Sequence, residues 1–203
     1  MFVPSVQSKR RTKLMTKNIM IVGVGGQGTL LASRILGNVV IGEGYDVKVS
    51  EVHGMSQRGG SVVTYVKYGD KVYSPIIDKG GADIILAFEM LEAYRALPFL
   101  KKGGKMLANN QEISPMPVIT GKMEYPQDID KKISEKADLT AINALSLAEQ
   151  AGNIKAVNVV LIGLLAKSSE IAYDKWVAAI EKTVPAKFLE VNKKAFDLGY
   201  NAI

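Results

Sequence analysis

The chain has 203 residues, of which 47% are hydrophobic and 23% are charged; this composition is that of an ordinary folded protein and excludes a chain that is disordered throughout. Five basic side chains and no acid lie in residues 1–17, so the net charge of +6 leaves only +1 for the other 186 residues. So weak a charge excludes an extended basic face for nucleic acid, and we expect no nucleic-acid partner.

The chain contains no cysteine, which excludes disulfides, a cysteine nucleophile and an iron–sulfur cluster held by this chain. It has one histidine, so a metal site made only of histidines is also excluded. The apolar run at 159–166 is far shorter than the ~18 residues of a membrane span, and no secretion-signal cleavage site follows the basic start. We therefore expect a cytoplasmic protein that binds no metal and no membrane.

The order of apolar and polar residues predicts alternating strands and helices. A β-branched run at 18–24 ends in glycine and leads into a helix over about 27–43, the first half of a β–α–β unit. Two alternating runs within 61–77, joined at Gly69 and Asp70, predict a β-hairpin. Further strands are predicted at residues 45–52, 82–88 and 104–110.

From about residue 127 the pattern is mainly helical, and Pro185 suits the start of the last helix. The run at 82–88 is apolar at nearly every position, as in a strand buried on both faces of a parallel sheet. These patterns predict a three-layer α/β/α sandwich with a mostly parallel sheet, a β-hairpin and a helical C-terminal third. We expect residues 1–17 to be a flexible basic extension and residues 18–203 a single domain.

A glycine fingerprint joins the first strand to the first helix, where Gly23, Gly25 and Gly28 form G-x-G-x-x-G. The first glycine permits a sharp turn, the second lets a phosphate or another backbone approach, and the third lets helix and strand pack. A dinucleotide enzyme would also use an acid near the end of the second strand, where Glu51 lies. A tight crossing without ligand needs the same glycines, so both interpretations remain open.

The segment at 51–69 follows the second predicted strand, and we expect it beside the glycine turn at the carboxyl edge of the sheet. It carries His53 and Arg58, the two candidate catalytic residues, and the planar guanidinium of Arg58 suits a carboxylate or a phosphate. The other candidate donors for an anion are Ser56, Gln57, Gly59 and Gly60. A loop histidine bonded to backbone and an interface ion pair are the structural alternatives, and no Ser/His/Asp set can be assembled around these residues.

Three stretches carry a resemblance to a known family: "IVGVGGQG" (21–28), "EVHGMSQRGGSV" (51–62) and "DIILAFEMLEA" (83–93). Over about residues 18–200 the chain resembles the gamma module of 2-oxoacid ferredoxin oxidoreductases, the group that includes the beta subunit of indolepyruvate ferredoxin oxidoreductase. The glycine turn is common to many folds, whereas the "HGMSQRGGSV" loop is distinctive of this family.

The resemblance implies a Rossmann-like domain that works only inside a larger complex and is inactive alone. There, thiamine diphosphate attacks the 2-oxo acid and carbon dioxide leaves, electrons pass through [4Fe-4S] clusters to ferredoxin, and coenzyme A takes the acyl group. The expected substrates are indolepyruvate and other arylpyruvates. With no cysteine this chain would hold none of the clusters, and we expect a partner subunit to carry thiamine diphosphate and the clusters.

The resemblance also implies candidate contacts to a phosphate-bearing ligand such as coenzyme A, at Gly23, Gly25, Gly26, Gln27 and Gly28. From its position and its many donors, we expect the 53–60 loop to line or buttress the composite active site, with Arg58 facing an anionic group of substrate, coenzyme A or thiamine diphosphate. Three alternatives remain open: the equivalent gamma subunit of a pyruvate, 2-oxoglutarate or 2-oxoisovalerate enzyme, a free-standing NAD or FAD enzyme, and a purely structural module. The thiamine diphosphate motif of such enzymes is Gly-Asp-Gly followed by Asn-Asn. We do not expect it here, because residues 68–71 lack the second glycine and the asparagine pair at 109–110 comes too late.

Overall fold

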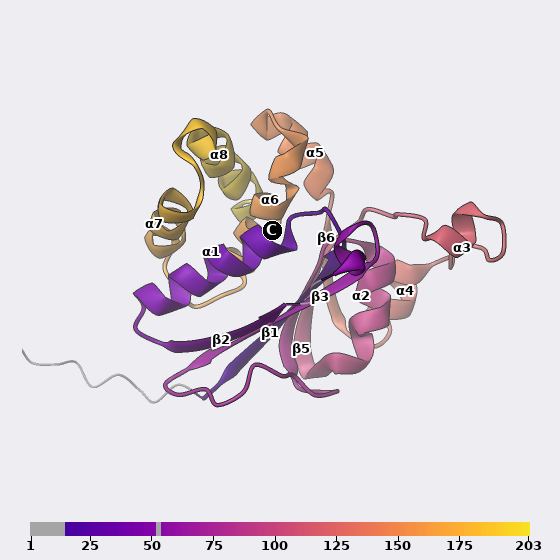
Figure 1. Cartoon of the computed structure of the whole chain (residues 1–203), viewed down its shortest axis with the longest axis horizontal. Helices are drawn as coiled ribbons and strands as arrows, with labels where there is room; N and C mark the ends of the chain where they lie inside the picture. Colours follow the sequence, from indigo (N-terminus) through magenta and orange to yellow (C-terminus); the bar gives the residue numbers. More distant parts are fainter. Residues whose placement is uncertain (1–14, 52–53) are drawn as a thin grey trace, which may run out of the picture.

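The computed structural model describes residues 15–51 and 54–203, in which a six-stranded sheet lies between two layers of helices (Figure 1). The strands are β1 (Lys17–Val24), β2 (Asp46–Glu51), β3 (Ser61–Gly69), β4 (Ala82–Ala87), β5 (Leu100–Asn109) and β6 (Asp138–Ile142). Their order across the sheet is β2-β3-β1-β4-β5-β6. β1, β4, β5 and β6 pair in parallel, and β3 runs antiparallel to both of its neighbours.

The helices fall into two groups (Figure 1). One face of the sheet carries α1 (Thr29–Gly42) and, in the C-terminal part, α5 (Ala144–Ala151), α6 (Val157–Lys167), α7 (Tyr173–Thr183) and α8 (Leu189–Tyr200). The other face carries α2 (Met90–Ala96) and α4 (Ile129–Ser134). The short helix α3 (Met116–Ile119) projects from the body, and single 3-10 turns are η1 (Met55–Gln57), η2 (Leu97–Phe99), η3 (Ile154–Ala156) and η4 (Ala186–Phe188).

The central strand β1 shows why the sheet must be covered twice. Ile19 and Ile21 pack into the core under α1, whereas Met20 and Val22 pack into the core under α2. Because successive side chains of a strand point to opposite faces, a strand that is apolar at all four positions needs a hydrophobic layer on each side. The predicted three-layer α/β/α sandwich with a mostly parallel sheet and a helical C-terminal third is confirmed.

The predicted hairpin at Gly69 and Asp70 is wrong, since residues 70–81 contain no strand. β3 already pairs with β1 on one side and β2 on the other, so it has no free edge for another strand. The segment is held instead by isolated hydrogen bonds, such as the one from the Val72 amide to Asp46 Oδ2 at 2.8 Å. Pro75 has no amide hydrogen to donate to a strand partner. The hairpin of this fold is formed by β2 and β3.

Strand β6 was not predicted, because its five residues lie in a region whose pattern is otherwise helical. The expected β–α–β unit is present in altered form: β2 runs parallel to β1, but β3 lies between them. The carboxyl ends of β1, β2, β4, β5 and β6 therefore share one edge of the sheet with the start of β3. Among residues 15–51 and 54–203, no helix has the length and apolar character that crossing a membrane requires.

Candidate functional site

The glycine turn after β1 is in direct contact with the loop between β2 and β3. The Gly25 amide donates to the Gly60 carbonyl at 2.8 Å. A Cβ on Gly25 would lie 2.3 Å from the Ser56 carbonyl oxygen and 2.4 Å from the Gln57 carbonyl carbon. Of the two uses that the fingerprint allows for its second glycine, close approach of another backbone is therefore the one observed. The loop backbone therefore fills the Cβ side of Gly25.

The first and third glycines of the fingerprint also have partners within the chain. A Cβ on Gly23 would lie 2.9 Å from the Phe88 Cβ at the end of β4. Gly28 has a left-handed φ of 84° as the N-cap of α1, and a Cβ there would lie 2.5 Å from the Asn158 side-chain nitrogen in α6. Gly26 differs, because it is exposed and no atom lies within 4 Å of its hypothetical Cβ. Of these four glycines, only Gly26 has no neighbouring atom at the position of its hypothetical Cβ.

Gln27 connects three strands at this edge. Its Oε1 accepts a hydrogen bond from the Val24 amide at 2.7 Å, and its Nε2 donates to the Phe88 carbonyl at 3.1 Å and to Gln111 Oε1 at 3.4 Å. Asn109, which is fully buried, donates to the same two oxygens and accepts from the Ala144 amide at 3.1 Å. The asparagine at the end of β5 is therefore a structural bridge between β4 and α5. Gln111 and Asn109 are not among the site residues predicted from the sequence.

The predicted loop residues are divided between the interior and the surface. Ser56 and Gln57 are half-buried under the glycine turn, whereas Arg58 and Gly59 are exposed. Arg58 makes no ion pair with any residue of the described ranges. His53 lies outside the described residues. The structure thus brings Ser56, Gln57 and Gly60 against the turn and leaves Arg58 facing solvent.

A cavity of about 260 Å³ lies between the turn and the loop. It is lined by Gly25, Gly26, Gly28, Thr29, Leu30, Gln57, Val62 and Thr64. α1 begins here without a side-chain cap, so no side chain of the N-cap residue accepts from the first free amides of the helix. Those amides and the helix dipole favour a negative charge at this position. The cavity is smaller than the roughly 300–1,000 Å³ of usual small-molecule sites. It offers room for one anionic group rather than for a whole dinucleotide.

Two buried carboxylates lie at the start of α2. Glu89 is 1% exposed and accepts from the Glu92 amide at 2.8 Å, the Ile113 amide at 3.0 Å and the Tyr125 hydroxyl at 2.6 Å. Burial, followed by the bond to Glu89, raises the pKa of Tyr125, so this hydroxyl remains a donor. Glu92 is 4% exposed and accepts from Ser61 Oγ and from its neighbour along α2, Arg95. Buried carboxylates are stable only when they are paired by hydrogen bonds or charges, as both of these are. The sequence signal for this pair was the presence of two acids inside the apolar run "FEMLEA" (88–93).

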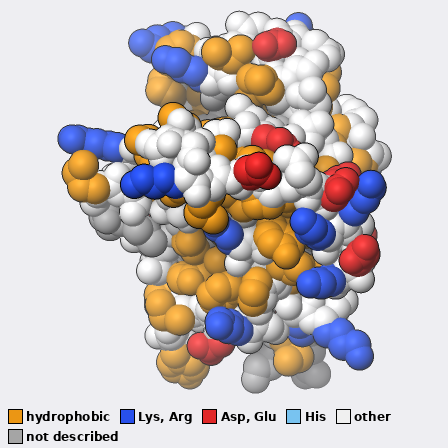
Figure 2. Space-filling model, turned by 90° about the vertical axis from the view of Figure 1, so that its right-hand side faces the viewer, with side chains coloured by type: hydrophobic (Ala, Val, Ile, Leu, Met, Phe, Trp, Pro, Cys, Tyr) orange, Lys and Arg blue, Asp and Glu red, His pale blue; other side chains and the backbone are white. Residues whose placement is uncertain are grey.

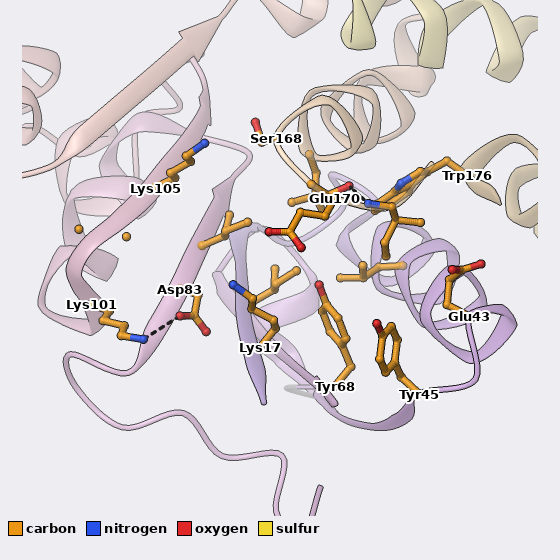
Figure 3. A pocket seen from close by; sticks show the side chains of 18 of the residues that line it. Lys17, Glu43, Tyr45, Tyr68, Asp83, Lys101, Lys105, Ser168, Glu170 and Trp176 are labelled. Atoms are coloured by element: carbon orange, nitrogen blue, oxygen red, sulfur yellow. Dashed lines mark hydrogen bonds and ion pairs between the residues drawn. The ribbon is translucent and has the colours of Figure 1, made fainter. Parts of the chain in front are cut away.

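A second cavity, of about 500 Å³, lies at the opposite edge of the sheet (Figure 3). Lys17, Tyr68 and Glu170 point toward one another in it, and Lys101 pairs with Asp83 at 3.1 Å. Burial, with smaller effects of nearby tyrosine and carboxylate groups, raises the pKa of Tyr68 to about 12. This cavity contains none of the residues that the sequence singled out.

The cysteines that would hold an iron–sulfur cluster are absent from the chain, and the candidate acid for a ribose is already hydrogen-bonded. The chain has no cysteine, and the described residues contain no group of three or more histidine, aspartate or glutamate side chains able to hold a metal ion. Glu51, the candidate acid for a ribose, accepts a hydrogen bond from Ser33 Oγ of α1 at 2.7 Å. That carboxylate thus serves to join β2 to α1.

Comparison with known proteins supplies the family. Residues 18–202 match the model of the pyruvate ferredoxin/flavodoxin oxidoreductase family. The chain is 44% identical over 191 residues to the indolepyruvate oxidoreductase subunit IorB of Pyrococcus horikoshii, a match that covers 91% of this chain and 95% of that protein.

Two solved structures share the fold. The keto/oxoacid ferredoxin oxidoreductase gamma subunit of Geobacter sulfurreducens aligns with a TM-score of 0.68 and 24% identity, over 91% of this chain and 96% of its own. The 2-oxoglutarate:ferredoxin oxidoreductase of Magnetococcus marinus aligns with a TM-score of 0.71 and 17% identity, over 94% of this chain and 31% of its own. The chain belongs to the pyruvate ferredoxin/flavodoxin oxidoreductase family.

Proposed function

We propose that this chain is a subunit of a ferredoxin-dependent complex that oxidatively decarboxylates indolepyruvate and other arylpyruvates. It is the subunit that holds none of the iron–sulfur clusters. The products are the aryl-acetyl-CoA, carbon dioxide and reduced ferredoxin. The observation that carries the proposal is the 44% identity to an indolepyruvate oxidoreductase subunit, which extends over nearly the whole of both chains.

The partner in this proposal is a subunit that holds thiamine diphosphate and the iron–sulfur clusters, since this chain lacks cysteine. Thiamine diphosphate, when bound there, would supply the carbanion chemistry of decarboxylation. The proposal includes one domain over residues 18–203 and a basic extension over residues 1–17. It also includes a cytoplasmic location, because a chain without cysteine has no disulfides, as is usual for proteins of the reducing cytoplasm.

This chain would contribute an anion site at the carboxyl edge of the sheet. The uncapped start of α1 and the cavity beside Gly26 support the binding of a phosphate, such as one from coenzyme A. The exposed Arg58 supports a contact to an anionic group of the 2-oxo acid, coenzyme A or thiamine diphosphate. The bond between Gly25 and Gly60 holds the loop that carries Arg58. His53 stays a candidate catalytic residue.

The first experiment is anaerobic, coenzyme A-dependent dye reduction by the cluster-bearing subunit, with and without this chain. Indolepyruvate, phenylpyruvate, pyruvate and 2-oxoglutarate are compared as substrates. We expect activity to require both chains and to favour the aryl substrates. A partner that is equally active alone would refute the proposal, as would tight binding of NAD or FAD by the isolated chain; a preference for another 2-oxo acid would refute the arylpyruvate assignment.

Arg58→Ala tests the contribution of the loop. We expect the KM of coenzyme A or of the 2-oxo acid to rise about tenfold or more, because a charge-assisted hydrogen bond is lost, while the complex still assembles. Arg58→Lys, which keeps the charge but loses the planar fork, should lie between the wild type and the alanine variant. Unchanged assembly, KM and kcat in Arg58→Ala would show that Arg58 takes no part in the site.

A further inference from the structure

The segment between β5 and α4 forms a projecting arm, defined here as residues 112–125, that carries α3 at its tip (Figure 1). Three large apolar side chains of this arm are strongly exposed: Met116 at 66%, Ile119 at 65% and Met123 at 65%. α3 makes no extended contact with another described helix or strand. Single exposed apolar residues are common, but three together on a projection are typical of an interaction site.

The base of the arm is fixed to the body by the buried carboxylate of Glu89. One end of the arm is held by the Ile113 amide and the other by the Tyr125 hydroxyl, and both donate to Glu89 Oε1. The Met90 amide also donates to the Gln111 carbonyl at 3.0 Å, at the root of the arm. A buried carboxylate therefore closes the arm into a loop. Glu89 thereby joins the outgoing and returning segments of the arm, which have little apolar core of their own.

The tip has an internal structure that restricts its conformations. The amides of Lys122 and Met123 both donate to the Pro117 carbonyl, at 2.9 and 3.1 Å. Proline residues at 115, 117 and 126 restrict the backbone further. A segment restricted in this way loses less conformational entropy when it binds, and methionine adapts its shape to an apolar partner surface.

The arm emerges from the same edge of the sheet as the candidate site. Its root residue Gln111 accepts a hydrogen bond from Gln27 of the glycine turn. Hydrophobic side chains gather across the middle of the face that carries α3 (Figure 2). The glycine turn lies at that edge beside the loop that carries Arg58. Under the proposed function the cluster-bearing subunit must reach these residues, so it docks at the edge from which the arm projects. In the Magnetococcus marinus protein the shared fold accounts for 31% of the chain, so this fold occurs there with a large additional polypeptide.

We propose that the 112–125 arm inserts its apolar tip into an apolar groove of the cluster-bearing subunit and so holds the carboxyl edge against the reacting centre. This proposal rests on the proposed function, because that function supplies the partner. Burying Met116 and Ile119 would stabilise the complex by the hydrophobic effect.

The test uses the full chain and the cognate cluster-bearing subunit. M116D/I119D should leave the thermal midpoint of the isolated chain unchanged, because both side chains are exposed, and should raise the dissociation constant of the complex about 100-fold. Ile154→Asp is the matched control, since Ile154 is 58% exposed on η3 and remote from the arm in sequence; it should leave the constant unchanged. M116L/I119L should restore wild-type affinity.

The outcomes separate the two proposals. If the wild-type chain binds and activates the partner and M116D/I119D does so equally well, the arm proposal is refuted and the proposed function stands. Failure of the wild-type chain to bind the partner would refute both. If the wild-type chain is a dimer that M116D/I119D converts to a monomer, with partner binding unchanged, the arm joins two copies and the proposal is also refuted.

Discussion

Replacing Gly25 by alanine would place one methyl group against the loop between β2 and β3. Its Cβ would lie 2.3 Å from the Ser56 carbonyl oxygen and 2.4 Å from the Gln57 carbonyl carbon, both of them backbone atoms. Gly25 is not among the residues with positive φ, so alanine tolerates this backbone conformation. The effect of the substitution is therefore steric, and it acts on the contact that joins the glycine turn to residues 56–60.

Backbone atoms cannot rotate away as a flexible side chain can, so the loop has to move. Overpacking of this kind costs about 1–3 kcal/mol. The Gly25 to Gly60 hydrogen bond, 2.8 Å in the native chain, would lengthen as the loop moves. Since the loop is partly exposed, release of the loop limits the total cost, and we expect the free energy of unfolding to fall by about 1–3 kcal/mol. For a chain of this size that corresponds to roughly 2–4 °C in Tm per kcal/mol.

The assay is urea unfolding of Gly25→Ala and of Gly37→Ala, followed by the dye-reduction assay of each complex. Gly37 lies within α1, and no atom lies within 4 Å of its hypothetical Cβ, so alanine there should stabilise the chain by up to about 1 kcal/mol. Gly25→Ala should be destabilised and its complex less active, because the loop carries Arg58. An unchanged urea midpoint for Gly25→Ala would refute the inferred packing of loop against turn.

Three further predictions concern the body of the fold. Gly199→Ala would place a Cβ 1.9 Å from the Val160 carbonyl oxygen, where α8 crosses α6; we expect a loss of about 3 kcal/mol in urea unfolding, and wild-type stability would contradict this close approach. Asn109→Ala would leave the buried Ala144 amide without its acceptor, so unfolding should become easier by about 1–3 kcal/mol, and a change below about 0.5 kcal/mol would count against the bridge. The raised pKa of Tyr68, about 12, means that its contribution to stability is complete below pH 10 and declines as the pH rises from 10 to about 12, because the unfolded chain loses this proton first. Tyr68→Phe should weaken that decline in alkaline urea titrations, and superimposable profiles would refute the assignment.

Local patterns in the sequence were sufficient for the fold class. The apolar run at 18–24 could be assigned as a buried strand because each face of β1 faces its own core. The glycine fingerprint located the first strand-to-helix turn, and the loop at 51–60 was expected beside it. The contact between Gly25 and Gly60 bears out that neighbourhood. These features depend on residues close in sequence, or on the general rule that parallel strands end at one edge.

The tertiary structure alone decided which strands pair and which polar groups meet. The run after Gly69 alternates like a strand, yet β1 and β2 already occupy both sides of β3. A local pattern does not record that competition for an edge. Glu89 is likewise an acid within a local apolar run, and nothing near it in sequence indicates its role. It anchors the base of the arm because it accepts hydrogen bonds from Ile113 and Tyr125, which are 24 and 36 residues away. Periodicity reports which face of an element is apolar, whereas strand pairing and buried hydrogen bonds depend on distant residues that only the folded chain brings together.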